Sequence, residues 1–235
     1  MVRAFPDIEG RSGFASAATE SGPNVRDAAS AYRYLTGVWP EAANIDCDAD
    51  FDRHVLASIL ALASSEGSDL AAQAGLTEAD LGDLFSRCFP ARGVESCSDQ
   101  QASVVDADEI EMVRELLLEN RSSEGECGRW LAAMIARRAM EPNHLWEDLG
   151  LRDRSELTRL IARHFAPLAL RNDKNMRWKR FIYRMMCEDD GFVMCSTPVC
   201  SNCADYQLCY GAETGSSRVA STAQQPATPA DGQTV

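Results

Sequence analysis

The sequence lacks the features that would place the chain in a membrane or on a secretion route. No apolar run reaches the roughly 18 residues that are needed to span a bilayer. The N-terminus mixes charge with glycine and has no apolar core, so it makes a poor signal peptide. We also find no convincing alternating pattern of a strand. We therefore expect a cytoplasmic all-α protein without membrane contact.

The motifs of common catalytic sites are missing as well. The sequence contains no Gly-rich phosphate loop, no G-x-S-x-G elbow and no H-E-x-x-H pair. Its only histidines are His54, His144 and His164, and no serine or cysteine has an obvious histidine partner. We therefore expect a protein that is not an enzyme.

Positive charge is also scarce, with 23 Lys and Arg against 36 Asp and Glu and a net charge of −13. Neutralisation of phosphates supplies most non-specific affinity for nucleic acids, so this balance argues against a nucleic-acid partner. It does not exclude a local basic patch, and one exists near the C-terminus, formed by Arg177, Lys179, Arg180 and Arg184.

Between two termini that we expect to be disordered, the chain is predicted to form a helical bundle. Residues 1–24 have no periodicity, and residues 214–235 are poor in bulky apolar side chains. We divide the rest into a helical domain, 25–186, and a cysteine-rich segment, 187–213. Apolar residues at three- and four-residue intervals predict helices over 27–37, 51–63, 77–90, 106–120, 129–139, 155–165 and 176–187.

Two parts of the helical domain resemble one another at an offset of 75 positions. Residues 56–61 match residues 131–136, and Gly75 with Leu76 matches Gly150 with Leu151. The helical sequences that follow are also similar, and they set Cys88 opposite His164. This pattern favours a bundle that contains two related helix-turn-helix units.

Five of the nine cysteines lie between positions 187 and 209, and four of them have the spacing C-x4-C-x2-C-x5-C. Such a density in a cytoplasmic protein indicates metal or redox chemistry instead of disulfides. The cysteine loop, as we call residues 195–209, presents Cys195, Cys200, Cys203 and Cys209 as candidate ligands, and Cys187 lies just upstream. We expect the scattered thiols Cys47, Cys88, Cys97 and Cys127 to be small buried hydrophobes.

The spacing alone leaves two kinds of metal centre open. Structural zinc also takes four thiolates, but its ligands are usually two separated C-x2-C hooks, and here only Cys200 and Cys203 form one. An iron–sulfur cluster is larger, and the opening C-x4-C-x2-C matches the start of the plant-type ferredoxin spacing. The nearby basic residues could offset the charge of such a cluster or attract an anionic precursor such as molybdate. They could equally form a solvated helix face.

Residues 176–213 resemble the C-terminal signature of the NifQ family of bacterial nitrogen-fixation proteins. The similar parts are M-R-W-K-R-F-I-Y-R-M-M-C-E-D-D-G-F and C-S-T-P-V-C-S-N-C-A-D-Y-Q-L-C-Y-G-A-E, and upstream W-L-A-A-M-I-A-R-R-A-M-E-P-N-H-L-W-E-D-L-G-L and R-H-F-A-P-L-A. The resemblance covers residues 110–213 well and the first hundred residues loosely. One departure is Tyr210, where we would expect phenylalanine.

The resemblance implies a molybdenum–iron–sulfur cluster carrier that donates molybdenum for biosynthesis of the nitrogenase iron–molybdenum cofactor. It implies that Cys195, Cys200, Cys203 and Cys209 bind the cluster. Cys187 matches a family cysteine whose role is less certain, and His144 and His164 are further candidates for contact with the metal. The implied partners are nitrogenase cofactor-assembly proteins, namely a scaffold complex and the iron protein, and we expect a monomer.

Two alternatives from other functional classes stay open at this point. The first is an iron–sulfur protein without molybdenum that transfers electrons or senses redox state. The second is a zinc-stabilised helical interaction module, or a nucleic-acid binder similar to the iron–sulfur DNA glycosylases. Metal content distinguishes these possibilities, because only the carrier requires molybdenum.

Overall fold

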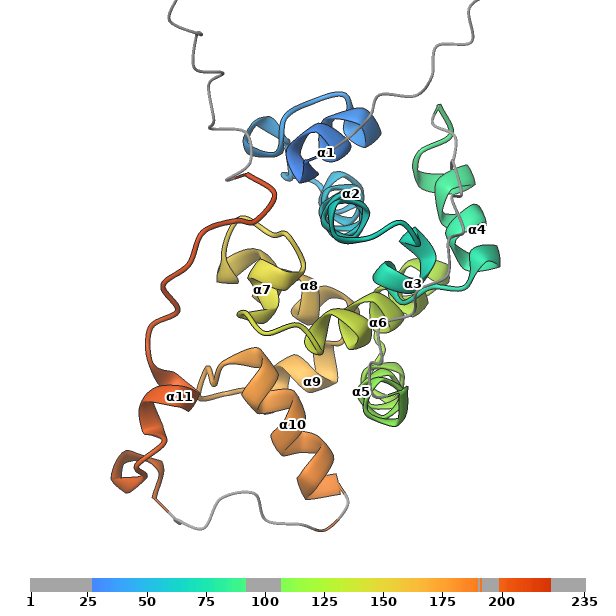
Figure 1. The fold of residues 1–235 in the computed structure, drawn as a ribbon. Coiled ribbons are helices and arrows are strands. Elements are labelled where there is room, and N and C mark those ends of the chain that lie inside the picture. The colour runs from blue at the N-terminus through green and yellow to red at the C-terminus, as the bar shows by residue number, and fades with distance from the viewer. Residues whose placement is uncertain (1–26, 92–106, 190, 192–198, 221–235) are drawn as a thin grey trace, which may run out of the picture.

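A computed structural model of the chain describes residues 27–91, 107–189, 191 and 199–220. Across these ranges all regular elements are helical, as predicted (Figure 1). The longer helices are α1 (Ala28–Thr36), α2 (Asp48–Glu66), α4 (Glu78–Cys88), α5 (Ala107–Glu119), α6 (Glu126–Ala139), α8 (Arg154–His164) and α10 (Trp178–Asp189). The short ones are η1 (Pro40–Ala42), α3 (Leu70–Ala74), α7 (Leu145–Asp148), α9 (Ala166–Arg171), η2 (Cys200–Asn202) and α11 (Tyr206–Tyr210).

Side-chain caps explain where several helices begin. The Asp27 carboxylate accepts a hydrogen bond from the backbone N–H of Ser30 at the start of α1, over 2.9 Å. Asp69 caps α3 and Asp153 caps α8 in the same manner. Each cap satisfies a backbone N–H that has no partner within the first turn of its helix. The helix starts are therefore fixed locally by the sequence.

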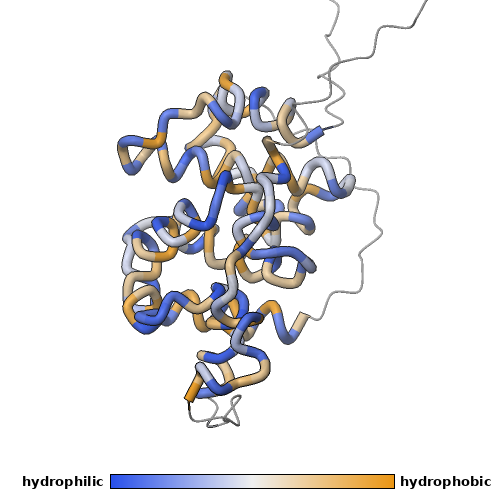
Figure 2. Tube along the Cα trace, turned by 90° about the vertical axis from the view of Figure 1, so that its left-hand side faces the viewer, coloured by the Kyte–Doolittle hydropathy of each residue, from blue (hydrophilic) through white to orange (hydrophobic). Residues whose placement is uncertain are grey.

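The core is built around α2 and α6. Both helices are apolar on most of their circumference, and the interior of α2 includes Phe51 and Ile59, neither of which has any solvent exposure. Trp130 and Met134 of α6 are similarly buried. In Figure 2 hydrophobic and hydrophilic residues alternate along the helical segments of the trace. These two helices hold the bundle together.

The two predicted units, α2–α4 and α6–α8, have equivalent turns. Gly75 and Gly150 end α3 and the α7 turn with φ angles of 72° and 70°. Phe89 and Phe165 end α4 and α8 with nearly identical backbone angles, φ −135° and ψ 52° against φ −136° and ψ 50°. The internal similarity at an offset of 75 positions therefore corresponds to a repeated local structure.

The two units also contact each other reciprocally. A Cβ atom at Gly75 would lie 2.8 Å from the carbonyl oxygen of Ala133 on α6, and one at Gly150 would lie 2.9 Å from that of Ser58 on α2. Ser58 and Ala133 are themselves 75 positions apart, as the two glycines are. Each turn thus packs on the long helix of the other unit at the equivalent residue. This is the pattern of a self-complementary interface about a two-fold axis.

Helix α10 packs against α5 and directs the chain into the cysteine loop. Its predicted apolar face is confirmed, because Trp178, Phe181, Ile182 and Met185 are all buried. Beside it, the fully buried guanidinium of Arg138 forms an ion pair with Glu66 at 2.5 Å.

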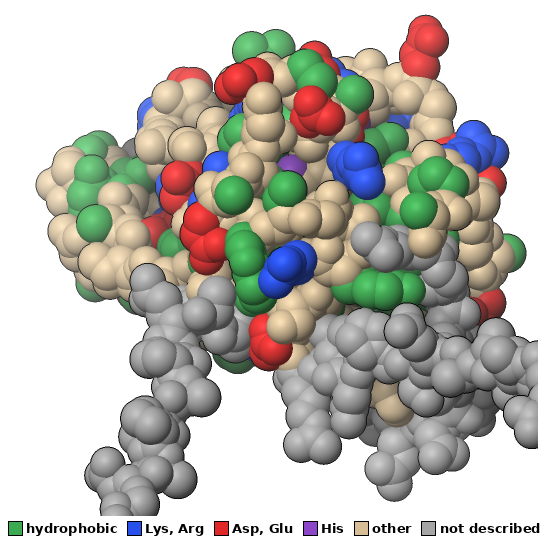
Figure 3. Space-filling model, turned by 90° about the horizontal axis from the view of Figure 1, so that it is seen from above, with side chains coloured by type: hydrophobic (Ala, Val, Ile, Leu, Met, Phe, Trp, Pro, Cys, Tyr) green, Lys and Arg blue, Asp and Glu red, His purple; other side chains and the backbone are tan. Residues whose placement is uncertain are grey.

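The helices of the described ranges include none with the length and apolarity that crossing a membrane requires. The face seen from above carries acidic and basic side chains among apolar ones, without a continuous basic surface (Figure 3).

Candidate metal centre

The described part of the cysteine loop, residues 199–209, is a succession of tight turns. The N–H of Cys203 donates to the carbonyl of Cys200 over 3.0 Å and closes the η2 turn. The N–H of Tyr206 donates to the carbonyl of Cys203 over 3.1 Å, and α11 then places Cys209 one turn further on. These turns keep three cysteines within one short stretch of backbone.

The structure describes three of the four predicted loop ligands. All three, Cys200, Cys203 and Cys209, are half-buried. Cys195 lies outside the described residues. Cys187 is a free, half-buried thiol near the end of α10, which leads into the loop. Half-buried thiolates are the ligands that iron and other soft metals prefer, so the donor set fits a metal centre in chemistry and in access.

Tyr210 contacts the loop directly. Its hydroxyl donates a hydrogen bond to the Cys200 sulfur over 3.7 Å, and its ring lies against Tyr206 with the ring centroids 5.0 Å apart. Burial, followed by the hydrogen bond to Cys200, raises the pKa of Tyr210 to about 12. The hydroxyl therefore keeps its proton near neutral pH and can donate to a thiolate sulfur. The expected phenylalanine could not do this.

Arg177 fixes the end of the loop to the start of α10. Its backbone N–H donates to the carbonyl of Cys209 over 2.8 Å. Its guanidinium donates to the carbonyls of Gly211 and Ala212 over 3.1 and 2.8 Å. These bonds satisfy the Cys209 carbonyl in the last turn of α11 and two carbonyls of the non-helical segment that follows, which otherwise would depend on water.

Residues 211–220, which we call the strap, continue from the loop along the bundle. Glu213 is buried and forms an ion pair with Arg154 at 2.6 Å, and Arg218 pairs with Glu66 at 2.5 Å. The Val219 side chain is fully buried in the core. The prediction of a disordered tail from residue 214 is therefore wrong for residues 214–220, while residues 221–235 and 1–24 lie outside the described residues. One valine and one arginine anchor a segment whose average composition suggested disorder.

Most of the basic side chains in and just before α10 bind partners within the protein. The Lys179 ammonium is largely buried and donates to Asp148 over 2.6 Å and to the carbonyl of Glu141. Burial lowers the pKa of Lys179, and the Asp148 carboxylate opposes that shift. Arg184 pairs with Glu188 at 2.6 Å. For Lys179 and Arg177 the solvated-face interpretation is wrong, because both bind partners within the bundle and the strap.

A cavity of about 360 Å³ adjoins the loop between α9 and α10. Tyr210 forms part of its wall, and three basic side chains line it, namely those of Arg171, Lys174 and Arg184. Asp173 and Glu188 also line it, so its charge is mixed. Open space therefore adjoins Tyr210, whose hydroxyl contacts Cys200.

The two histidine candidates lie in different parts of the molecule. His144 precedes α7 at its N-cap, and its Nδ1 atom is 3.8 Å from the Glu213 carboxylate of the strap. His164 ends α8, is buried, and contacts Asp52 of α2. Neither has a recorded contact with the described loop cysteines. Both stay predictions as metal contacts in the loop.

Three features of this region were missed from the sequence. The contacts of Arg177 join positions more than thirty residues apart, and the Arg154–Glu213 pair joins α8 to the strap, so no spacing rule reveals them. For the hydrogen bond to Cys200, the departure from phenylalanine at position 210 was a usable signal. The prediction that the scattered cysteines are small buried hydrophobes was also only partly right. Cys47 is exposed and caps α2, while Cys88 and Cys127 are half-buried. Cys97 lies outside the described residues.

Comparison with known proteins gives a consistent result. A sequence model of the NifQ family matches residues 55–211. The chain is 38% identical over 190 residues to the NifQ homolog of Sinorhizobium fredii. The matched stretch covers 77% of this chain and 80% of that protein. It is 39% identical over 140 residues to NifQ of Azotobacter vinelandii, covering 60% of this chain and 68% of the relative. For NifQ of Rhodobacter capsulatus the identity is 41% over 150 residues, covering 60% and 77%.

No solved structure matches the chain. The family match includes Cys195, Cys200, Cys203 and Cys209, together with α10 and most of the bundle. The chain belongs to the NifQ family.

Proposed function

We propose that this protein carries a molybdenum–iron–sulfur cluster and donates molybdenum for biosynthesis of the nitrogenase iron–molybdenum cofactor. Its family is one of nitrogen-fixation proteins. The observation that carries the proposal is the position of Cys200, Cys203 and Cys209. They are half-buried on consecutive tight turns at the edge of the bundle, and of the three only Cys209 also packs against the core.

Binding at an edge suits a cargo that must be received and released. Thiolates bind iron and reduced molybdenum strongly, yet their bonds exchange with other thiolates and with sulfide. A cluster held by Cys195 and the three described thiols would remain accessible to a partner. An electron-transfer protein without molybdenum would not need that access for exchange of the metal.

Neighbouring residues support the cargo in specific ways. The Tyr210 hydroxyl can donate to a ligand sulfur, which stabilises negative charge on a thiolate-bound cluster. Arg177 holds the carbonyls after Cys209 and so keeps the last ligand in place. The cavity with Arg171, Lys174 and Arg184 offers basic side chains to an anionic precursor such as molybdate.

Apolar side chains around the loop offer a docking surface for the assembly proteins. Val199 and Leu208 are 51% and 47% exposed, beside Tyr206. Single exposed apolar residues are ordinary, but these three flank the proposed cargo. The proposed partners are the scaffold complex and the iron protein of cofactor assembly, and we propose a cytoplasmic monomer that transfers cargo without catalysis of its own.

The test is a metal analysis of protein purified without oxygen from cells grown with molybdate. We expect iron, sulfide and molybdenum together, and transfer of that molybdenum to an assembly mixture that lacks it. The Cys203→Ala variant should lose the iron and molybdenum while keeping the helical circular dichroism spectrum. The Cys47→Ser variant is the matched control, because Cys47 is exposed and serine can also cap α2.

Three outcomes would contradict the proposal. Iron and sulfide without molybdenum would indicate the electron-transfer or sensing alternative. One zinc per chain in a colourless protein would indicate the structural module. A normal metal load in the Cys203→Ala protein would exclude the loop as the binding site.

A further inference from the structure

A second set of metal-ligating side chains lies within the bundle, apart from the cysteine loop. Asp52 on α2, Cys127 on α6 and His164 at the end of α8 each offer one donor atom, and the three atoms lie within 4.8 Å of one another. His164 is only 1% exposed, while Asp52 and Cys127 are half-buried. Residues from three separate helices thus converge on one point.

Hydrogen bonds fix the histidine ring and the carboxylate. The Nε2 atom of His164 is 2.9 Å from Asp52 Oδ1, and Nδ1 is 2.9 Å from the Ser123 hydroxyl. Arg163 donates to both oxygens of Asp52, over 2.7 and 2.9 Å. A metal-binding histidine commonly donates its second ring N–H to an oxygen, and Ser123 is placed to accept that bond.

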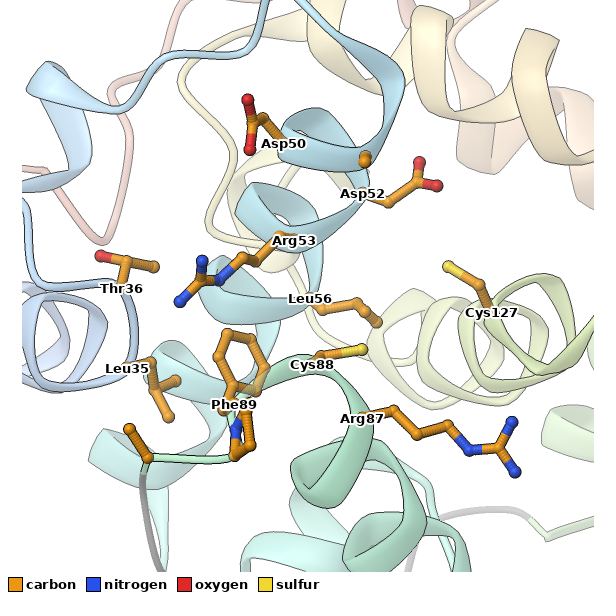
Figure 4. A pocket seen from close by; sticks show the side chains of 13 residues that line it. Leu35, Thr36, Asp50, Asp52, Arg53, Leu56, Arg87, Cys88, Phe89 and Cys127 are labelled. Atoms are coloured by element: carbon orange, nitrogen blue, oxygen red, sulfur yellow. The ribbon is translucent and has the colours of Figure 1, made fainter.

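A fourth donor, Cys88, lies across an adjoining cavity of about 640 Å³. Asp52, Cys88 and Cys127 all line this cavity. In Figure 4 the sulfur atoms of Cys88 from α4 and Cys127 from α6 border the same space, and the Cys127 sulfur is the nearer of the two to the Asp52 carboxylate. His164 does not line this cavity, but it contacts Asp52, which does. The cavity gives the donors a path to solvent.

These four residues, the central donor cluster, consist of two equivalent pairs. Asp52 and Cys127 are 75 positions apart, which is the offset between the two units. Cys88 and His164 end α4 and α8, at the two turns whose backbone angles agree. Each unit therefore contributes one donor from its first helix and one from the end of its last helix.

We propose that Asp52, Cys88, Cys127 and His164 bind one divalent transition-metal ion of the zinc class. Thiolate and imidazole donors favour Zn²⁺, Fe²⁺ or Co²⁺ over Mg²⁺ or Ca²⁺. Metal–ligand bonds of about 2.0–2.3 Å place tetrahedral donors roughly 3.3–3.8 Å apart. The most widely spaced donors among Asp52, Cys127 and His164 would therefore approach by up to about 1 Å, while His164 Nε2 and Asp52 Oδ1, now 2.9 Å apart, would separate slightly. Rotation of side chains that border a cavity can supply such a movement.

Charge and protons balance at this site. Two thiolates and one carboxylate neutralise the divalent cation together with the Arg163 guanidinium. Burial raises the pKa of Cys127 to about 12 and also raises that of Cys88, so both are thiols in the metal-free protein. Binding replaces two S–H bonds by two metal–sulfur bonds and releases two protons to solvent. For Nε2 of His164 to bind the ion, the ring proton has to lie on Nδ1, which faces the Ser123 hydroxyl.

The test separates this site from the cysteine loop. In the full-length chain with Cys187, Cys195, Cys200, Cys203 and Cys209 replaced by serine, we expect one Co²⁺ per chain under reducing, oxygen-free conditions. The cobalt spectrum should show tetrahedral ligand-field bands and thiolate charge transfer, and Zn²⁺ should displace the cobalt. Because this chain has no loop thiols, the result does not depend on the proposed function.

Single variants in that background identify the ligands. Cys127→Ser and His164→Gln should weaken cobalt binding by at least about 100-fold, and Cys88→Ser by about 10-fold or more. Cys47→Ser should leave it unchanged. A helical chain that binds no stoichiometric cobalt, or that binds it equally well with His164→Gln, would overturn the proposal.

A second measurement applies if the serine-substituted chain does not fold. The natural-sequence chain, freed of cargo, should bind one more Co²⁺ than its His164→Gln variant when both have the same helical spectrum. Equal cobalt content of the two folded proteins would also overturn the proposal, because the central donor cluster would then be only an ion-pair and hydrogen-bond network.

Discussion

The cysteine loop and the central donor cluster hold similar chemical groups but are built in different ways. The loop places its thiols within one short stretch of turns, at the edge of the bundle. The central donor cluster draws Asp52, Cys88, Cys127 and His164 from four helices that only the folded chain brings together. A local site can therefore change without loss of the fold, whereas a site assembled by tertiary packing shares its energetics with the bundle.

The largest effect is expected at Gly150, which joins the two units. An alanine there would require a left-handed φ of 70° and would place its Cβ 2.5 Å from Val219 Cγ2 of the strap and 2.9 Å from the Ser58 carbonyl oxygen of the other unit. We expect Gly150→Ala to lower the free energy of unfolding by about 2–4 kcal/mol, from backbone strain and overpacking together. Urea denaturation measures this change.

Gly37→Ala is the matched control, since Gly37 has a φ of 84° but open space around its Cβ position. Strain alone should cost about 1–2 kcal/mol there. Equal losses at the two glycines would show that the contact between the units is not tight.

A smaller effect is expected at Asp52, within the central donor cluster. In metal-free protein Asp52→Ala removes the partner of both Arg163 and His164, so we expect a loss of about 2–3 kcal/mol in the free energy of unfolding. The Cys200→Ser variant of the loop should change it by less than about 0.5 kcal/mol. If the loop variant proved the more destabilising of the two, the distinction between local and assembled sites would fail.

The strap links the loop to the bundle and should show a moderate, pH-dependent effect through Glu66. Burial alone would raise the pKa of this carboxyl, but the hydrogen bonds and charges of Arg138 and Arg218 outweigh it and hold the pKa below the ordinary 4.5. The stabilisation is therefore complete well above pH 4.5 and is lost as the pH falls through the lowered value.

We expect Glu66→Gln to cost about 1–2 kcal/mol at pH 7, and the difference from the unaltered chain to shrink in acid. Urea denaturation at several pH values measures it, with Glu124→Gln as an exposed control. A difference that stayed constant between pH 7 and pH 3 would show that the charge of Glu66 is not what stabilises the strap.

The smallest effect is expected at Tyr210, inside the loop. Tyr210→Phe removes the donor to the Cys200 sulfur and should cost roughly 0.5–1 kcal/mol. In the cluster-loaded protein we expect the reduction potential to fall by roughly tens of millivolts, because a hydrogen bond to sulfur favours the more negative state. Tyr206→Phe is the control, and an unchanged potential in the Tyr210 variant would exclude Tyr210 as a tuning group.

Much of the fold could be predicted because helix signals are local. The caps at Asp27 and Asp153 and the apolar periodicity of α10 identify these helices directly. The ends of α2 were less accurate, since it continues to Asp48 and Glu66, beyond the predicted 51–63. Burial on nearly all sides removes the amphipathic contrast that marks helix ends.

The candidate sites were predictable to different degrees for the same reason. The spacing of the loop cysteines is contained in fifteen residues, so a candidate metal site can be proposed there without a structure. Cys127 and Asp52 have no such signal, because their proximity depends on the packing of α2 against α6. Val219 fills the core through a single side chain, which average composition cannot reveal.

The strap has a further consequence for how a partner could collect cargo. Arg177, Arg154 and Glu66 hold the chain that follows Cys209 against the bundle, so the C-terminal end of the loop is fixed to the helices. Under the proposed function, an acceptor protein would therefore have to approach the bundle itself to reach Cys209 and its neighbours. The acceptor would then have to adapt its approach to a surface that the strap holds in place.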